Sequence, residues 1–224
     1  MPVYFLSKKI EFPPVELAHP DGLLAIGGDL SPERLILAYK SGIFPWYADD
    51  QPILWYSPED RMVLYPSQLH VSRSLQRTLR QGQFTHTFDK AFTRVIHECA
   101  VADRHGQIGT WITDEMIAGY CELHRQGYAH SVETWENGEL VGGIYGVSLG
   151  GAFFGESMFK KRSNASKAAL VSLVEKIGEW GFHFLDCQVY TEHMKCFGAQ
   201  MLTRFDYLNA LRESLEMPDR VGKW

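Results

Sequence analysis

The segment from Tyr128 to Phe159 constrains the fold more than any other part of the sequence. It contains three runs rich in β-branched and aromatic residues, YAHSVETW, ELVGGIYGVSL and AFFGESMF, separated by ENG and GG. Asn137-Gly138 is a strong hairpin-turn signal, because both residue types tolerate the positive φ of a two-residue turn. The pattern predicts three consecutive antiparallel strands.

Helical patterns stand on both sides of these strands. Before them we expect helices over residues 66–82, 88–100 and 113–127, and after them a helix from Asn164 to Trp180. An apolar strand, FHFLDCQV, follows that helix, and two shorter helices complete the chain. The arrangement predicts an α+β, or mixed α/β, fold around one sheet. The order strand–strand–strand–helix–strand resembles that of acyl-CoA N-acyltransferases.

The first 62 residues differ in composition from the rest. They are rich in Pro, Gly and aromatic residues and hold one clear helix signal, DLSPERLILAYKSG, with Ser31 as N-cap and Gly42 as its end. We therefore expect a small N-terminal domain over residues 1–62 and a larger domain over residues 63–224. We expect each to be folded onto the other.

Overall charge and apolar content exclude several classes of protein. The net charge of −5 argues against a general polyanion binder, although a local basic patch is compatible with it. No stretch approaches the roughly 20 apolar residues of a membrane helix, and the N-terminus does not read as a signal peptide. The four cysteines are scattered without CxxC spacing, and the histidines lack paired-ligand spacing, so we predict no metal. A cytoplasmic protein fits best.

Glu156 is the first candidate for chemistry, since a buried carboxylate without a partner is costly. Strict alternation divides its strand between two faces, with Phe154, Glu156 and Met158 on one and Phe153, Gly155 and Ser157 on the other. Gly155 is a candidate for a β-bulge that re-aims a neighbour. Two interpretations stay open: Glu156 holds a cation at the mouth of an apolar slot, or it pairs with Lys160, Lys161 or Arg162.

Asp186 and Gln188 are the second candidate, at the end of the strand FHFLDCQV. Two positions apart, they share a face, so the carboxylate can anchor the amide NH₂ while the amide oxygen accepts from an amine. Because an amide is a poor proton base, Gln188 would position a nucleophile rather than deprotonate it. The alternative is a polar pair that only satisfies the end of the strand.

Arginines and tryptophans are candidates for nucleic-acid contacts. Arg73, Arg77 and Arg80 fall on one face of the predicted helix 66–82 and could hold phosphates. Trp46 and Trp111 stand in loops and could stack on a base, which is worth about 1–3 kcal/mol each. A solvated helix face and a filled core are the alternatives.

Several long motifs, in the same order, carry a family resemblance: GLLAIGGDLSPERLILAYKSGIFPWY, PILWYSP, GTWIT, LVGGIYGVSLGGAFFGESMF, NASKAAL and LDCQV. They resemble leucyl/phenylalanyl-tRNA–protein transferases over nearly the whole chain. The resemblance implies a bacterial cytoplasmic enzyme that moves Leu or Phe, less readily Met, from aminoacyl-tRNA. The acceptor would be the α-amino group of a protein that begins with Arg or Lys, and the product an N-degron read by the degradation machinery.

The resemblance also implies a small N-terminal domain and a C-terminal domain related to the acyl-CoA N-acyltransferase fold. The transferred side chain would enter a pocket formed by a set of mostly apolar residues: Ile144, Phe153, Gly155, Ser157, Met158 and Leu173. At Ile144 and Leu173 this sequence departs from the Met and Phe of the family pattern, which would reshape the pocket.

Further residue roles follow from the same resemblance. Glu156 would hold the amino group of the aminoacyl moiety or help place the incoming amine. Trp46 and Trp111 would contact the terminal adenosine, and the three arginines the acceptor stem. From the DxQ spacing itself, we expect Gln188, oriented by Asp186, to position the attacking amine, with proton transfer partly through the ribose 2′-hydroxyl or water. The aminoacyl ester is already activated, so no cofactor, ATP or metal would be needed, and the protein would act as a monomer with no membrane partner.

Two other functions were weighed against this one. An acyl-CoA-dependent N-acetyltransferase would share the fold, but its glycine-containing pyrophosphate loop is missing from KKRSNASKAAL. A non-catalytic aminoacyl-tRNA-binding module would bind without turnover, and nothing in the sequence favours it.

Overall fold

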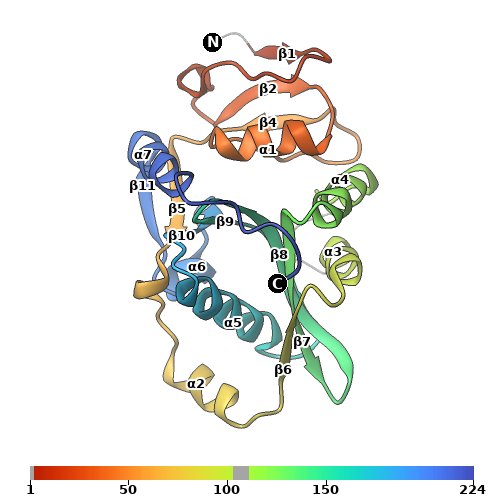
Figure 1. The fold of residues 1–224 in the computed structure, drawn as a ribbon, viewed down its shortest axis with the longest axis vertical. Helices are drawn as coiled ribbons and strands as arrows, with labels where there is room; N and C mark the ends of the chain where they lie inside the picture. Colours follow the sequence, from red (N-terminus) through yellow and green to blue (C-terminus); the bar gives the residue numbers. More distant parts are fainter. Residues whose placement is uncertain (1–2, 103–110) are drawn as a thin grey trace.

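Two β-sheets organise the molecule in a computed structural model, which describes residues 3–102 and 111–224 (Figure 1). The N-terminal sheet has the strand order β1-β2-β4-β3. Its strands are β1 (Tyr4–Leu6), β2 (Leu23–Gly27), β3 (Phe44–Pro45) and β4 (Leu54–Tyr56). Helix α1 (Pro32–Lys40) packs below this sheet, between Ser31 and Gly42, as its sequence signal predicts. Gly42 ends the helix at φ 74°, a conformation that favours glycine.

The second sheet has seven strands in the order β11-β5-β10-β9-β8-β7-β6. The strands are β5 (Asp60–Leu64), β6 (Thr85–Phe88), β7 (Ala129–Glu136), β8 (Glu139–Leu149), β9 (Ala152–Lys160), β10 (Phe184–Gln188) and β11 (Gln200–Thr203). The helices after α1 are α2 (Arg73–Arg80), α3 (Phe92–Ala100), α4 (Asp114–Arg125), α5 (Ala165–Glu179), α6 (Glu192–Cys196) and α7 (Arg204–Ser214). Short 3₁₀ turns lie at η1 (Val15–Leu17) and η2 (Pro66–Gln68).

The predicted three-stranded meander is confirmed as β7, β8 and β9, all antiparallel. Asn137 and Gly138 form the first turn, both with positive φ. Helix α5 then crosses over to β10, which pairs with β9 in parallel from Phe184 to Asp186. The predicted mixed α/β class and the order strand–strand–strand–helix–strand are therefore confirmed.

Helices cover both faces of the large sheet (Figure 1). Helix α5 lies on one face, and α3 and α4 lie on the other. The α3–α4 face shares a single apolar cluster with the N-terminal sheet, which includes Leu35, Trp55, Tyr145 and Phe154. The N-terminal part is thus packed onto the large sheet through a common core, and the boundary expected at residue 62 stays a prediction.

The predicted helix over residues 66–82 is shorter than expected. Residues 66–68 form the turn η2, and the helix α2 begins only at Arg73. The Ser72 hydroxyl accepts from the amide of Leu75 at 3.3 Å, and this N-cap sets the start of the helix. Leu75 is buried and the three arginines are exposed, as the face analysis predicts.

Strict alternation along β9 is wrong, because a bulge interrupts the β8–β9 pairing. Ser157 pairs with Tyr145 and Gly155 pairs with Gly146, so Glu156 is the extra residue. Glycine at 146 permits this close approach, since a Cβ there would lie 2.1 Å from the carbonyl oxygen of Phe154. Phe154 therefore packs on the α3–α4 side, whereas Met158 packs against the cluster under α5.

Candidate active site

A cavity of about 480 Å³ lies where β9 and β10 part after Phe154 and Asp186. The N-terminal segment 44–46, Trp111, strands β8 and β9, helix α5 and residues 185–194 contribute its walls. The apolar lining residues include Phe44, Pro45, Ile144, Met158, Leu170, Leu185, Val189 and Met194. Glu156, Asp186 and Gln188 are the carboxyl and carboxamide groups among the lining residues. The cavity is therefore apolar with a small polar wall, as ligand sites commonly are.

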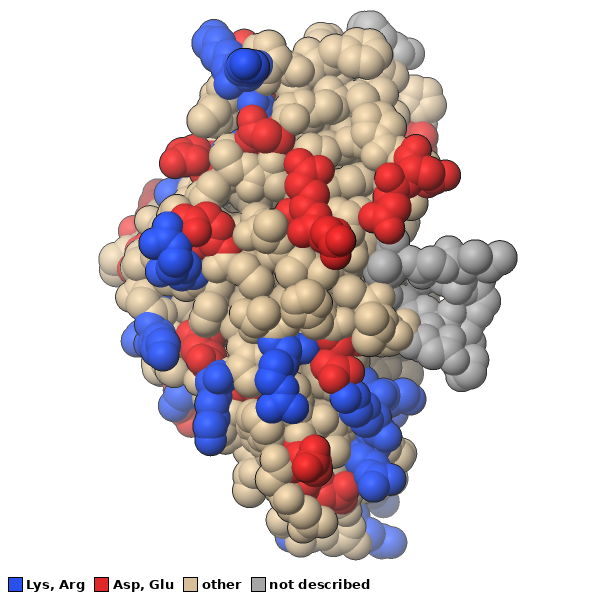
Figure 2. Space-filling view, turned by 90° about the vertical axis from the view of Figure 1, so that its right-hand side faces the viewer, with Lys and Arg blue, Asp and Glu red and all other residues tan. Residues whose placement is uncertain are grey.

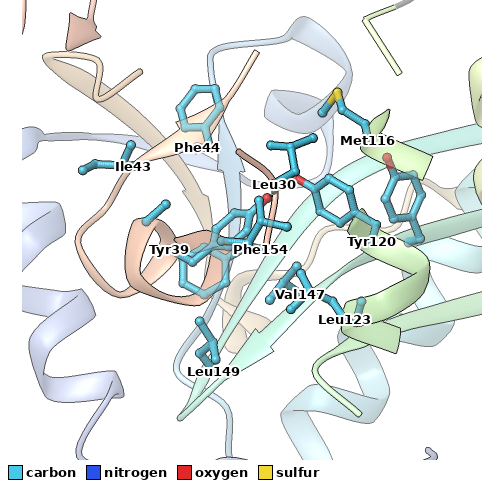
Figure 3. Close-up of a cluster of buried hydrophobic side chains, with 14 of the residues drawn as sticks. Leu30, Tyr39, Ile43, Phe44, Met116, Tyr120, Leu123, Val147, Leu149 and Phe154 are labelled. Carbon is cyan, nitrogen blue, oxygen red and sulfur yellow. Dashed lines mark hydrogen bonds between the residues drawn. The ribbon is translucent and has the colours of Figure 1, made fainter. Parts of the chain in front are cut away.

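The bulge turns the carboxylate of Glu156 toward two buried tyrosines. The Tyr39 hydroxyl donates to Oε1 at 2.7 Å, and the Tyr120 hydroxyl donates to Oε2 at 2.8 Å. The two hydroxyls also hydrogen-bond each other. Figure 3 shows Tyr39, from α1, and Tyr120, from α4, meeting in the apolar cluster around Phe154. Among the described residues, Tyr39, Tyr120 and Gln188 are the hydrogen-bond partners of Glu156, in place of the expected Lys160, Lys161 or Arg162. Lys161 pairs with Glu98 and Arg162 with Glu136.

Glu156 is held close to the point of titration at neutral pH. Burial raises the pKa of its carboxyl from 4.5 to about 7, against hydrogen bonds from Tyr39, Tyr120 and Gln188 that lower it. Burial, followed by the neighbouring Glu156, raises the pKa of both tyrosines well above 10. The tyrosines therefore stay protonated as donors, while Glu156 can change its charge.

Gln188 joins the same cluster from β10. Its amide nitrogen donates to Glu156 Oε1 at 2.8 Å, so its amide oxygen is the acceptor that it can offer to an amine. Its backbone has φ 63°, in the left-handed region, and lies at a bulge opposite β5. The same-face prediction for Asp186 and Gln188 fails at this bulge, because Cys187 is the extra residue in the pairing.

Asp186 anchors the backbone of Gln188 and not its side chain. Its Oδ1 accepts from the Gln188 amide at 2.8 Å. Arg61 on β5 binds both oxygens, with Nε to Oδ1 at 2.9 Å and Nη2 to Oδ2 at 2.7 Å. The Tyr207 hydroxyl donates to Oδ2 at 2.7 Å. Arg61 and Asp186 are 1% and 0% exposed, so this is a fully buried ion pair.

Arg61 also contacts the N-terminal wall of the cavity. Its guanidinium lies 4.6 Å from the ring centre of Phe44 and donates to the carbonyl of Gly42 at 3.4 Å. Burial alone favours neutral guanidine, but the Asp186 carboxylate raises the pKa of Arg61 above its ordinary value. Arg61 therefore stays charged and joins the strand that carries Gln188 to the segment that carries Trp46.

Most of the predicted site residues meet at this cavity. Nine of them line it: Trp46, Trp111, Ile144, Gly155, Glu156, Ser157, Met158, Asp186 and Gln188. Phe153 and Leu173 are not among the described lining residues; they are 1% and 0% exposed and lie deeper, in the cluster under α5. The three arginines lie apart from the cavity, around a shallow hollow on α2.

Charge is unevenly spread over the surface that carries α3 and α4. Figure 2 shows Lys and Arg gathered on the half of the molecule that bears α2 and the β6–β7 edge. Asp and Glu dominate the half nearer the N-terminal sheet, apart from a small basic group at its end. In Figure 1, α2 lies at the same end of the molecule as this basic half.

Tyr39, Tyr120 and Arg61 are site residues that the sequence reasoning missed. No spacing links them to Glu156 or Asp186, because each comes from a different element and reaches the site only through tertiary packing. One general rule indicates such partners. A carboxylate removed from water requires hydrogen-bond donors, and Tyr and Arg side chains can supply them.

In the part of the chain that the structure describes, no cluster of three or more His, Cys, Asp or Glu side chains could hold a metal ion. None of the described helices is both long and apolar enough to span a membrane.

A carboxylate with tyrosine donors, an anchored amide and an apolar slot are compatible with a site that joins an amine to an activated acyl group. Comparison with known proteins gives the same class. Residues 63–212 match the family described as leucyl/phenylalanyl-tRNA protein transferase, and residues 28–59 match the N-terminal domain of that family. The chain belongs to the leucyl/phenylalanyl-tRNA–protein transferase family, and it is an aminoacyltransferase.

Full-length relatives carry the same family name. A leucyl/phenylalanyl-tRNA–protein transferase from an Anaeromyxobacter species is 55% identical over all of this chain and 95% of its own length. One from Oleidesulfovibrio alaskensis is 56% identical over all of this chain and 92% of its own length. Among solved structures, a GCN5-related N-acetyltransferase from Kribbella flavida aligns with 75% of this chain and 60% of its own, at 10% identity and a TM-score of 0.38.

Proposed function

We propose that this protein transfers Leu or Phe, and less readily Met, from aminoacyl-tRNA to proteins that begin with Arg or Lys. The new bond joins the carbonyl of the donor to the α-amino group of the acceptor and creates an N-degron. The observation that supports it most is the position of Glu156, a partly buried carboxylate that lines an apolar cavity together with Trp46 and Trp111. We further propose that the protein works as a monomer in the cytoplasm.

The apolar part of the cavity suits the side chain of the donor. Ile144 and Met158 would form its near wall, with Leu170 and Leu185 beside them. Phe153 and Leu173 would support that wall from behind, in the cluster that also contains Ile144. Gly155 and Ser157 flank Glu156 and leave room for the ester. Discrimination between Leu and Phe would be modest, because one methylene in such a slot is worth about 1–3 kcal/mol.

The two tryptophans of the cavity wall, Trp46 and Trp111, suit the terminal adenosine of the tRNA. Trp46 and Trp111 both line the cavity, and Trp46 is 41% exposed, so its ring is accessible for stacking on a base. Arg73, Arg77 and Arg80 would hold phosphates of the acceptor stem, since all three are exposed on one helix. The basic half of the surface supports this placement.

The polar wall would carry out the transfer itself. The amine nitrogen attacks the ester carbonyl, the C–N bond forms, and the bond to the 3′-oxygen breaks, with a proton delivered to that oxygen. Glu156 would hold an amino group that enters the cavity, and the amide oxygen of Gln188 would orient the attacking amine. Asp186 would keep the backbone of Gln188 in place. Positioning alone can supply several kcal/mol of the barrier.

The direct experiment mixes the protein with Leu-, Phe-, Met- or Ile-charged tRNA and a peptide beginning with Arg. Mass spectrometry then identifies any residue added at the N-terminus. Addition of Leu and Phe, abolished when the α-amine of the peptide is acetylated, is the expected result. Addition to peptides that begin with Ala or Gly at the same rate would contradict the acceptor specificity, and no addition to any peptide would contradict the transfer.

A further inference from the structure

Tyr39, Tyr120 and Glu156 form a triangle of hydrogen-bonding contacts, and its protons can be counted. Each tyrosine brings one hydroxyl proton. The contacts number three: Tyr39 with Tyr120, Tyr39 with Glu156, and Tyr120 with Glu156. With Glu156 ionised, two protons serve three contacts, and one contact sets two lone pairs against each other. With Glu156 protonated, every contact has its own proton.

The two tyrosines of the triangle are enclosed, whereas Glu156 lines the cavity. Tyr39 and Tyr120 are both 0% exposed, and apolar side chains such as Phe154 and Leu30 surround them (Figure 3). The titratable and charged groups around the triangle come from three further strands: Tyr145 on β8, Asp186 on β10 and Arg61 on β5. Asp186 opposes ionisation of Glu156, and its own charge is already paired with Arg61.

The two carboxylate oxygens of Glu156 differ in their hydrogen bonds. Glu156 Oε1 accepts from both Tyr39 and Gln188, whereas Oε2 accepts from Tyr120. A carboxylate oxygen accepts about two hydrogen bonds, so Oε2 keeps one position for a donor. Glu156 lines the cavity, so a ligand in the cavity can reach its carboxylate.

We propose that Tyr39, Tyr120 and Glu156 act together as the proton acceptor for the attacking amine. This role rests on the proposed transfer reaction. The α-ammonium of the acceptor gives one proton to Glu156 Oε2, which leaves a neutral amine with a free lone pair. The protonated carboxyl then donates to Tyr120, whose hydroxyl turns to donate to Tyr39, while Tyr39 still donates to Oε1, so that each contact has one proton. That amine attacks the ester carbonyl, and its second proton goes to the departing 3′-oxygen. The proton on Glu156 returns to solvent after product release.

The proposal makes the two tyrosines part of the base and not only its scaffold. When Glu156 is protonated, one hydroxyl turns from the carboxyl toward the other tyrosine, so that the three hydrogen bonds run in one direction around the triangle. Removing one hydroxyl takes a hydrogen bond from the carboxylate, which disfavours the ionised form and raises the pKa of Glu156. A purely structural role, in which the hydroxyls do not stabilise the ionised carboxylate, would change the rate without moving the pH at which the rate changes.

The test is the pH dependence of single-turnover transfer from Leu-charged tRNA to an Arg-initiated peptide between pH 5.5 and 8.5, with both well below saturation so that the rate reports the pKa of the free protein. We expect the wild-type rate to rise about tenfold per pH unit below an inflection close to pH 7. In Y39F and in Y120F the inflection should move to higher pH. In E156Q it should vanish, with the rate at pH 8 lowered about 100-fold or more.

Tyr47→Phe is the matched control, because Tyr47 is also buried and its hydroxyl contacts Thr113 at 3.2 Å, outside the triangle. Its inflection should stay at the wild-type pH. An unchanged inflection in E156Q, or in both triangle variants, would overturn the proposal while leaving the transfer reaction standing. Circular dichroism on each variant separates misfolding from these outcomes. Absence of transfer by the wild-type protein would instead contradict the proposed function.

Discussion

Two acids stand side by side on strands β9 and β10, Asp186 fully buried and Glu156 partly buried, and their surroundings differ. Asp186 meets a cation, Arg61, through two hydrogen-bonded contacts, and Tyr207 adds a third donor. Glu156 is hydrogen-bonded by the neutral donors Tyr39, Tyr120 and Gln188. Both acids lie next to a β-bulge, and both line the cavity.

The difference separates an acid that stabilises the structure, Asp186, from an acid that can exchange a proton, Glu156. A buried carboxylate with a bidentate arginine keeps its charge, because the pair compensates the desolvation of both groups. A buried carboxylate with neutral donors is only partly compensated, and burial raises the pKa of Glu156 to about 7. Asp186 thus fixes the chain geometry, and Glu156 is free to exchange a proton.

The largest expected effect is the loss of transfer in Glu156→Gln, about 10²–10⁴-fold at pH 8. Its stability should behave in the opposite way. Because the folded pKa of about 7 lies above the ordinary 4.5, the protonated carboxyl favours folding, and this advantage is lost as pH rises from 4.5 through 7. Urea unfolding should therefore find the variant at least as stable as wild type at pH 8. A clear loss of stability there would show that Glu156 is a structural charge as well.

Asp186→Asn should lower the free energy of unfolding by about 3–5 kcal/mol, since it leaves the charge of Arg61 buried without its partner. Urea unfolding at pH 7 measures the change. The double variant Asp186→Asn, Arg61→Gln should recover part of it, because no buried charge remains. Equal stability of wild type and Asp186→Asn would break the contrast between the two acids.

Gln188 contacts both acids, Asp186 through its backbone N–H and Glu156 through its side-chain amide. Replacement by Ala or Gly removes the amide that Glu156 anchors, and both variants should lose about tenfold or more in transfer rate. Their stabilities should differ, because a residue with a Cβ costs roughly 1–2 kcal/mol at a left-handed φ such as 63°. Thermal unfolding should rank the Gly variant above the Ala variant. Unchanged turnover of a minimal aminoacyl-adenosine donor would refute the positioning role of Gln188.

The smallest effects are expected at the apolar wall. Met158 lines the cavity, whereas Phe153 lies behind it. Met158→Ala should shift the ratio of Phe to Leu transfer by about tenfold at most, in favour of the larger Phe. Phe153→Leu should shift the ratio less and should not abolish transfer. A complete loss in Phe153→Leu, with charged tRNA still bound, would assign Phe153 to the core alone.

The sequence predicted this molecule well wherever a local pattern determines structure. Turn residues and alternation are local, and they were enough for the meander β7–β9 and for the helix that ends at Gly42. The motifs around Glu156 and Gln188 likewise contributed six of the cavity-lining residues: Gly155, Glu156, Ser157, Met158, Asp186 and Gln188. The short strands β5, β6 and β11 were missed, because so few residues carry little periodicity and their pairing depends on distant strands.

The partners of the two acids could not be predicted from spacing. Arg61 lies 125 positions from Asp186, and Tyr39 lies 117 positions from Glu156. The bulges mattered more, since one extra residue turns the following side chains to the opposite face. Gly155 suggested a bulge in β9. The extra residue of that bulge is Glu156, and Gly146 on β8 leaves the space for it.

The protonation state of Glu156 tests the central claim most directly. Infrared difference spectroscopy, with the protein titrated from pH 5 to 9, detects the carbonyl band of a protonated carboxyl, and subtraction of the Glu156→Gln spectra assigns it. We expect a band present at pH 5 that disappears with a midpoint close to pH 7. A Glu156 carboxyl that is already ionised at pH 5 would contradict the contrast between the two acids.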